Sequence, residues 1–552
     1  MPLYHTPGVY FEWLDARQND IYMARTDIAG FVGIAARGPL HEPVKIESLI
    51  QFNSTFGDHI PQGYLAYAVE GFFLNGGSRC WVVRIADPQK AQYATLDLKL
   101  PTGASTLSLT ASSPGVWANQ LWVSVVDVGN ERFNLRLVLP DGTQEFWANI
   151  TMSNTGPRFV ADLLNNELAG SHLVRAGASA RIAAGAPLVA ASSVASGRLG
   201  DGADGLATLN QGHFSGEGAP PGQAWGLAAL EPIREISIVA IPDIMPKKRI
   251  EPPTYRPAPP RCDVLHPTPV PPPPVLQIEP EYPPLLDIVA LENSVIWHCE
   301  KLKNRVAVLD TQRDDQTPEQ ISAFRKNLYP TRYGALYCPW IKTPDPLGLE
   351  GLVRPVPASG SVAGVYARTE HQTGVHKPPA NEIVAGAEDV TVAIDDNSHG
   401  LLNDFGVNVI RAFNGRQIRI VGARTLAKPR DTQWIYVNVR RLLIMIERSI
   451  EAAAQWTVFE PSGPVLWREM DRVVRSFLDL LWRRGFLDGS EQKQAYSVVC
   501  DRTTNPEPEV ANGRVICEIG VLPPWPAEFV VVRLGRRASG IENLNALEAQ
   551  SG

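Results

Sequence analysis

The sequence predicts a multidomain protein that combines α/β and α+β architecture, and three observations lead to this prediction. At 552 residues, the chain exceeds what one hydrophobic core usually supports, so we expect about two to four domains. Short apolar strands alternate with helical segments through residues 205–420. Residues 421–535 instead place two regular helices before a group of short strands.

The segment 205–420 is predicted to form a central α/β domain. Ile236–Ile241 and Val306–Asp310 are apolar runs typical of buried strands, and Leu286–Lys303 has the pattern of a helix. Alternation of this kind favours a mainly parallel sheet covered by helices.

A proline-rich segment interrupts this domain between residues 246 and 284. It contains 15 prolines, including the run Pro271–Pro274. Such a segment cannot join a sheet ladder or a helix, so we expect an exposed polyproline-like loop. A ligand for a signalling domain is the alternative to this surface loop.

Two further domains are predicted before the central one. Residues 26–94 indicate a compact α/β segment, with an apolar run at Ile28–Ala36, a helix around Leu65–Phe73 and a strand at Cys80–Ile85. Residues 95–204 change to alternating strands, which indicates an inserted β-rich outer domain. Its predicted strands are Thr106–Thr110, Leu121–Val126 and Phe133–Leu139.

The first 25 residues are predicted to form an arm with a single strand-like run, Val9–Leu14. No hairpin partner lies near it in the sequence. This strand must therefore pair with a distant segment of its own chain or with another chain.

Residues 421–535 are predicted to form a C-terminal α+β module, followed by a flexible tail over residues 536–552. Asn438 is the expected cap of a helix that runs to about Trp456, whose apolar face holds Leu442, Ile446, Ile450 and Ala453. Pro464 should open a second helix that ends at Gly485. The expected sheet is short of strands for two helices, with strands at Ala495–Asp501, Arg514–Val521 and Glu528–Leu534.

The composition excludes several classes of protein. The net charge of -7 gives no reason to expect sequence-independent binding of nucleic acid. No apolar run approaches the length of a membrane span, and the first residues lack the pattern of a cleaved signal. The cysteines show no CxxC pair, and we interpret them as reduced thiols of a cytoplasmic protein, with one structural disulfide as the alternative; they are Cys80, Cys262, Cys299, Cys338, Cys500 and Cys517.

Catalytic motifs are absent from the sequence, which has no phosphate-binding loop, zinc-protease helix or nucleophile elbow. Asp395, Asp396 and His399 could suggest a metal or acid/base site, but the run around them is also typical of a loop, the interpretation we favour. Asp310 and His298 invite a hydrolase hypothesis, yet such residues occur in one domain readily by chance. We therefore expect no enzyme activity, no cofactor and no metal.

Several segments, in the same order along the chain, resemble contractile tail sheath proteins. In the N-terminal part they are Thr6–Tyr10, Thr26–Gly33, Arg37–Pro39 and Phe72–Gly77, which leads into Val82–Arg84. Further along they are His376–Asn381, Gly422–Leu426, Trp434–Arg441 and Val458–Pro461. The resemblance covers residues 1–90 and roughly 360–535 well, and the sheet domain between them more loosely.

The resemblance implies a subtilisin-like fold for the central domain, although the Gly-Thr-Ser nucleophile turn of that protease is absent. It also implies subunits stacked in six-fold rings around an inner tube, with each C-terminal sheet completed by strands from neighbours. The expected donors are Val9, Tyr10, Phe11, Glu12 and Trp13 in the arm, and Phe529, Val530, Val531, Val532 and Arg533 near the C-terminus.

The resemblance further implies a machine that contracts irreversibly into a tighter lattice and drives the tube through a target envelope. The expected partners are further copies of the chain, an inner tube protein, and baseplate and tail-terminator or cap proteins, without nucleic acid or membrane insertion. Assembly is expected in the bacterial cytoplasm, as part of a phage tail or a phage-tail-like particle that lysis can release.

The helix from Pro464 carries a charged face. Its predicted buried stripe is Leu466, Met470, Val473, Phe477 and Leu481, and its opposite side carries Arg468, Arg472 and Arg475. A solvated face is the ordinary interpretation, with Asp471 and Asp479 close enough to pair. The resemblance suggests instead that these arginines hold an acidic inner tube through many weak contacts.

Two other functions stay open from the sequence. One is a different structural tail component, such as a tube or baseplate-associated protein, although the α/β centre is a poor match to small β-barrel tube subunits. The other is an α/β hydrolase with appended domains, which would need a nucleophile, a base and an oxyanion hole.

Overall fold

The computed structural model describes residues 21–99, 105–129, 132–152, 157–167, 169–177, 195–244, 283–284, 286–313, 315, 317–348, 351–413, 415 and 417–528. The predicted arm strand Val9–Leu14, nearly all of the proline-rich loop and the donor segment from Phe529 to Arg533 lie outside these residues.

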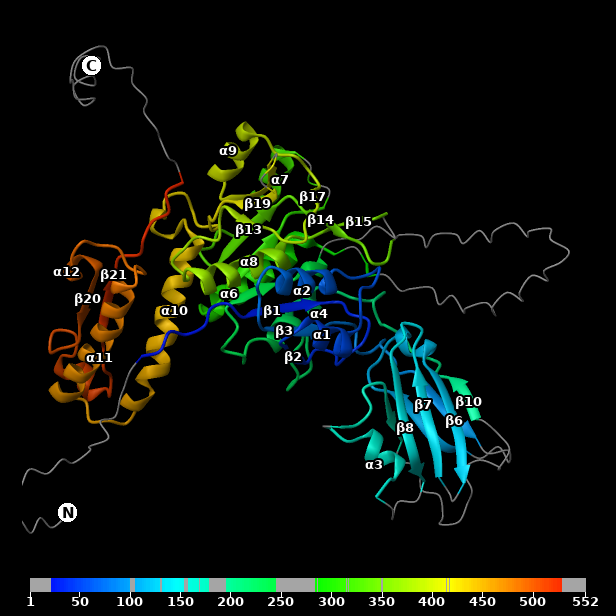
Figure 1. Cartoon of the computed structure of the whole chain (residues 1–552). Helices are drawn as coiled ribbons and strands as arrows, with labels where there is room; N and C mark the ends of the chain where they lie inside the picture. Colours follow the sequence, from blue (N-terminus) through cyan, green and yellow to red (C-terminus); the bar gives the residue numbers. More distant parts are fainter. Residues whose placement is uncertain are drawn as a thin grey trace, which may run out of the picture.

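A nine-stranded sheet forms the centre of the molecule (Figure 1). Six neighbouring strands run parallel, which confirms the mainly parallel sheet, and antiparallel strands flank them at both ends. The strands, in spatial order, are β16 (Glu382–Ile383), β19 (Gln417–Val421), β18 (Val407–Phe413), β13 (Gly334–Cys338), β12 (Val306–Asp310), β11 (Ile238–Ala240), β1 (Ala29–Gly33), β3 (Cys80–Arg84) and β2 (Pro43–Ile46). Segments 26–94 and 205–420 therefore contribute strands to one sheet.

Helices cover both faces of this sheet. Every residue of β1, β11, β12 and β13 is buried, as expected for strands packed on two sides. The connection from β1 to β3 contains α2 and leads toward the β2 edge of the sheet. The connection from β11 to β12 contains α6 and leads toward the β16 edge. Because such crossovers are right-handed, the two helices lie on opposite faces of the sheet. The helices of this region are α1 (Leu49–Phe56), α2 (Leu65–Leu74), α4 (Gln211–Ser215), α5 (Gly226–Ala229), α6 (Ile288–Leu302), α7 (Pro318–Asn327), α8 (Ser359–Gln372) and α9 (Asp396–Asp404).

Glycines let α2 and α8 approach closely. A Cβ atom added at Gly360 would overlap the Ala68 backbone, and one added at Gly364 would overlap the Phe72 carbonyl. These two glycines lie one turn apart on α8, so the helix presents bare backbone to α2. A short sheet of β14 (Ile341–Pro344), β15 (Val353–Val356) and β17 (Asp389–Val390) lies beside this layer.

The inserted β-rich region has its own core and projects from one end of the molecule (Figure 1). Alternate residues of β6 and β7, such as Val123, Val125, Leu135 and Leu137, are fully buried in that core. One sheet contains β10 (Ala195–Arg198), β6 (Trp122–Gly129), β7 (Arg132–Val138) and β8 (Gln144–Thr151). The other contains β4 (Thr95–Lys99), β5 (Ser105–Ala111) and β9 (Val174–Ala176), and α3 (Val160–Leu164) lies alongside.

The C-terminal module forms the opposite end of the molecule (Figure 1). Its elements are α10 (Val437–Ala453), α11 (Pro464–Arg483), α12 (Gln492–Ala495), β20 (Tyr496–Val499), α13 (Glu507–Ala511) and β21 (Glu518–Val521). The predicted cap at Asn438 is wrong, because the N-cap is Tyr436, two residues earlier, and Asn438 is the second residue of the helix. Asn438 is buried instead, and its side-chain amide donates a 2.7 Å hydrogen bond to the His376 carbonyl.

The first described residues connect the central sheet to this module. Glu370 on α8 accepts hydrogen bonds from the Thr26 N–H (2.9 Å) and hydroxyl (2.6 Å), and from the Arg441 guanidinium on α10 (2.7 Å). Arg441 also donates to the Thr26 carbonyl at 2.9 Å and stacks over the Tyr366 ring. Nearby, the Ala24 N–H donates to the Ser449 hydroxyl on α10. This Glu370–Arg441 network therefore fixes where the preceding arm leaves the domain.

We predict that Glu370→Ala destabilises the protein by about 3–5 kcal/mol, because it leaves the Arg441 charge buried without its partner. The Arg441 side chain is only 2% exposed. Thermal and denaturant unfolding of the purified chain measure the effect.

The control is Glu451→Ala, which breaks the Arg234–Glu451 pair on the surface of the same helix, where the side chains are 80% and 59% exposed. Exposed pairs contribute at most about 1 kcal/mol. Equal losses from the two variants would contradict a special role for the buried network.

Candidate assembly site

The C-terminal sheet has two strands within the described residues, β20 and β21, paired antiparallel from Tyr496 opposite Val521 to Val499 opposite Glu518. Tyr496 and Val498 are buried against α11, whereas Ser497 and Val499, which alternate with them, are exposed. These are two of the three predicted strands, and the third, Glu528–Leu534, lies almost wholly outside the described residues. Such a sheet offers backbone groups at its edges to a further strand.

The two edges of this sheet differ. The Leu522 N–H donates to the Ala495 carbonyl, so Ala495 and Leu522 form a hydrogen-bonded pair. Hydrogen-bonded and non-hydrogen-bonded pairs alternate along an antiparallel ladder, so Val498 and Ile519, three pairs further along, form a non-hydrogen-bonded pair. The backbone N–H and C=O groups of these two residues therefore point outward, away from the partner strand. On the β20 side, the Arg475 guanidinium donates to the outward Val498 carbonyl. On the β21 side, no described residue hydrogen-bonds to the outward N–H or C=O of Ile519. Of the two edges, the one along β21 is therefore the more accessible to a further strand.

Helix α11 packs its apolar side on α10 and the small sheet. The predicted residues Leu466, Val473, Phe477 and Leu481 are buried, whereas Met470 is only partly buried. The stripe is wider than predicted, because Trp467, Val474 and Leu478 are buried as well. Each of these follows a predicted residue directly, so a broader apolar face was readable from the sequence.

The three predicted contact arginines all lie exposed on α11, and each has a partner in its own module. Arg468 donates to the Pro464 carbonyl at 3.1 Å. Arg472 pairs with Glu469 at 2.6 Å, and this hydrogen bond lowers the pKa of the Glu469 carboxyl. Arg475 pairs with Asp471 at 2.6 Å in addition to its bond to the sheet. The face therefore carries acidic as well as basic groups.

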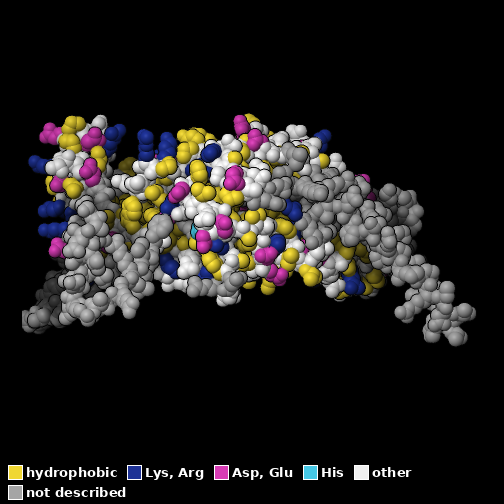
Figure 2. Space-filling view, turned by 90° about the horizontal axis from the view of Figure 1, so that it is seen from above, with side chains coloured by type: hydrophobic (Ala, Val, Ile, Leu, Met, Phe, Trp, Pro, Cys, Tyr) yellow, Lys and Arg dark blue, Asp and Glu magenta, His cyan; other side chains and the backbone are white. Residues whose placement is uncertain are grey.

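Basic side chains are nevertheless prominent at this end of the molecule. Seen from above, Lys and Arg side chains project from the end formed by the C-terminal module, with hydrophobic and acidic side chains between them (Figure 2). Arg472 keeps 62% of its side chain exposed despite its pairing with Glu469. Such pairs are weak in water, so the arginine can exchange partners at little cost.

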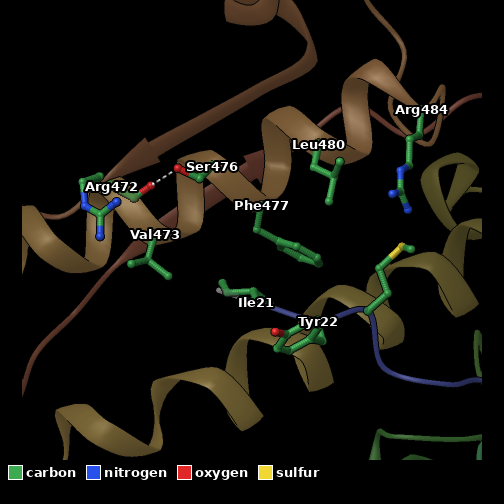
Figure 3. A pocket seen from close by; sticks show the side chains of 9 residues that line it. Ile21, Tyr22, Arg472, Val473, Ser476, Phe477, Leu480 and Arg484 are labelled. Carbon is green, nitrogen blue, oxygen red and sulfur yellow. Dashed lines mark hydrogen bonds between the residues drawn. The ribbon is translucent and has the colours of Figure 1, made fainter. Parts of the chain in front are cut away.

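A cavity of about 350 Å³ separates α11 from the chain that leads out of the arm (Figure 3). Phe477 and Ile21 point toward each other across it, and Arg472 and Arg484 stand at its two ends. Ile21 is buried in the core of the module, while Tyr22 is 81% exposed. Beside the cavity, Ile21 thus belongs to the same hydrophobic core as Val473 and Phe477 of α11.

The loop between α10 and α11 exposes an apolar tip. Phe459 is completely exposed and has a positive φ of 70°, and Val458 and Val465 beside it are also exposed. These residues form an exposed apolar tip next to α11. In the sequence, Val458–Pro461 stands out only as part of the resemblance.

The residues considered for chemistry have structural roles. Asp395 accepts the Ser398 N–H at 2.8 Å and caps α9, so the predicted loop around it is wrong: Asp396 and His399 lie in the helix. Asp310 is buried and accepts the Ala358 and Ser359 N–H groups at the start of α8, and burial raises its pKa to about 7. His298 lies beside Arg305 instead. Among the described residues, no cluster of three His, Cys, Asp or Glu side chains could hold a metal ion.

No helix in the described part of the chain combines the length and apolarity that crossing a membrane requires.

Comparison with known families identifies two matched segments. Residues 289–426 match the phage tail sheath protein central domain, and residues 430–535 match the phage tail sheath C-terminal domain. Among curated proteins, a putative prophage major tail sheath protein of Pseudomonas aeruginosa is 26% identical over 236 residues, covering 42% of this chain and 57% of that protein. The tail sheath protein of Salmonella phage ViI is 26% identical over 208 residues, covering 36% of this chain and 32% of that protein. The alignments thus span between a third and just over half of these relatives.

Solved structures extend the similarity in fold to nearly the whole chain. The sheath of an extracellular contractile injection system, PVC, in its contracted state has a TM-score of 0.55 at 18% identity, covering 97% of this chain and 99% of that one. The contracted helical sheath of the anti-feeding prophage also gives 0.55, at 19% identity, with 97% and 100% covered. The sheath tail protein of Listeria innocua gives 0.56 at 12% identity, with 92% and 97% covered.

These relatives and fold neighbours are structural tail sheath proteins and not enzymes. Residues 289–426 and 430–535 of this chain are therefore similar to the central and C-terminal domains of phage tail sheath proteins.

Proposed function

We propose that this chain is a sheath subunit that polymerises in six-fold helical rings around an inner tube and contracts to drive the tube through a target envelope. The observation that carries the proposal is the incomplete β20–β21 sheet with its accessible edge at β21, in a module that matches the sheath C-terminal domain. An edge of this kind binds a strand through backbone hydrogen bonds, and alternate side chains set the register.

The strand donors are the arm residues Val9–Trp13 and the C-terminal residues Phe529–Arg533, both outside the described residues. The arm leaves from Ile21 at the surface of α11, and the described chain ends at Glu528, whose carboxylate pairs with Arg424 at the edge of the central domain. Each segment therefore adjoins a described residue whose side chain is held within its own subunit. Donation to another copy is the function we assign to them.

Strand donation of this kind is a heterologous contact, because the donating surface differs from the receiving one. Contacts of this type generate open helical polymers rather than closed dimers. A second, tighter packing of lower free energy would trap the extended polymer kinetically and make contraction irreversible.

The placement of the domains supports an orientation in the polymer. The C-terminal module and the inserted β-rich region form opposite ends of the molecule (Figure 1). We assign the module to the inner surface, against the tube, and residues 95–204 to the outer surface, with a subtilisin-like central domain between them. The inner tube protein, baseplate proteins and tail-terminator or cap proteins are the partners of this arrangement.

Deletion of residues 1–20 should give a folded chain that does not polymerise. The Glu370–Arg441 network and Ile21 remain, so the unfolding midpoint should stay close to that of the full chain. Negative-stain electron microscopy would test for cylinders. A matched deletion of the tail residues 536–552 should still assemble, and long cylinders from the first variant would refute strand donation by the arm.

Replacing Ile519 with Pro tests the receiving edge. Proline removes the N–H that faces outward at this position, which an added strand would need, and edge strands tolerate proline there. Ile519→Pro should fold but assemble poorly, whereas Ile519→Ala, which keeps the N–H, should form cylinders. Equal assembly of the two variants, counted by electron microscopy, would show that the β21 edge receives no strand.

Arg468 and Arg472 are further proposed to hold an acidic tube in the extended state, together with Arg475. Arg475 also attaches α11 to β20, so reversing all three charges would confuse folding with tube binding. The double variant Arg468→Glu, Arg472→Glu should still form contracted cylinders but no extended, tube-filled sheath when mixed with the tube protein. Individually weak contacts repeated in every subunit account for so large a loss.

Arg483→Glu is the control for this charge reversal. Arg483 is 72% exposed and pairs with Asp479 at the far end of the same helix. If the double variant forms extended, tube-filled particles at the same yield as this control, Arg468 and Arg472 do not hold the tube and are only part of a solvated face.

A further inference from the structure

Cys500 and Cys517 face each other at the end of the C-terminal sheet. Val499 ends β20 and pairs with Glu518, the first residue of β21, so Cys500 and Cys517 directly beyond the two strand ends continue the same register. Ala495 and Leu522 form a hydrogen-bonded pair, and the two kinds of pair alternate along the ladder. Cys500 and Cys517, five pairs further along, are therefore a non-hydrogen-bonded pair.

The geometry of such a pair suits a disulfide. The two Cα atoms of a non-hydrogen-bonded pair lie about 4.5 Å apart, within the range of about 4.4–6.8 Å that disulfides occupy. Cys500 and Cys517 continue the alternation of Tyr496 and Val498 on one strand and of Ile519 and Val521 on the other, so both lie on the side of the sheet that packs on α11. Both thiols are therefore on the same side of the strand pair.

The two thiols differ in their access to solvent. Cys500 is 5% exposed, whereas Cys517 is partly exposed at the edge of the core. Burial raises the pKa of Cys517 to about 12. Little thiolate is therefore present at neutral pH, and the pair reacts slowly, as suits thiols that remain reduced during assembly in a reducing compartment.

We propose that Cys500 and Cys517 form a redox site that closes into a cross-strand disulfide by exchange with a small-molecule disulfide. The Cys517 thiolate attacks one sulfur of that disulfide, which releases one small thiol and leaves a mixed disulfide on Cys517. Cys500 then loses its proton and attacks the Cys517 sulfur, which releases the second small thiol. Two protein thiols are oxidised and one small disulfide is reduced to two thiols.

The bond would enclose residues 501–516, including α13, and fix the register of β20 and β21 covalently. The formation of the bond does not depend on the proposed sheath function, because the register belongs to the single chain. A cross-link beside Arg475 would nevertheless stiffen the sheet that strand donation uses.

The test is incubation of the full folded chain with oxidised glutathione, followed by counting of free thiols after denaturation. The count should fall from six to four. Trypsin separates residues 494–502 from residues 515–533, because cleavage follows Lys493, Arg502, Arg514 and Arg533. Mass spectrometry without reduction should find these two peptides joined, with the loss of two hydrogen masses.

Two single variants serve as controls and test the order of attack. Cys500→Ser should accumulate the mixed disulfide on Cys517, whereas Cys517→Ser should leave the buried Cys500 thiol free. No loss of thiols in the folded chain, or a cross-link that joins any other cysteine, would overturn the proposal.

Discussion

The buried contact between Glu370 and Arg441 is the interaction on which the arrangement of this molecule depends. It joins α8 of the central domain to α10 of the C-terminal module, and both partners also bind the backbone or hydroxyl of Thr26. Three parts of the chain thus meet at one charged pair. Because a buried charge without its partner is costly, this pair holds the C-terminal module and Thr26 against the central domain.

This connection differs in kind from the one that holds the inserted region. Residues 95–204 have a separate hydrophobic core, so substitutions there need not affect the sheet that β1 and β11 share. The C-terminal module, in contrast, is tied to the central domain by polar and charged contacts as well as by α10, whose Ile444 belongs to the central core and whose Leu442 belongs to the module core. A helix shared by two cores can transmit force between them, as the proposed contraction of the sheath requires.

Much of this fold could be predicted from local patterns, and the failures have a common cause. Both boundaries of the strand Val306–Asp310 agree with the prediction, since a short apolar run between turn residues is unambiguous. Asn438 looks like a cap in sequence, but its amide is used by the distant His376 carbonyl, which no local pattern encodes. Asp395 was taken for a loop residue because Asp favours turns and helix caps alike. On α11, the exposed face was predicted correctly, whereas the bond from Arg475 to the Val498 carbonyl depends on tertiary packing.

The hydrogen bond from Arg475 to the Val498 carbonyl also makes the two edges of the small sheet unequal. A two-stranded sheet with two open edges could add strands on both sides and aggregate without order. Arg475 covers the Val498 carbonyl on the β20 edge and is itself held by Asp471, whereas the corresponding groups of Ile519 on β21 meet no described residue. Strand addition is therefore favoured at one edge. In the assembly that we propose, a single receiving edge combined with donor segments of another copy would select the one-directional contact from which a helical polymer is built.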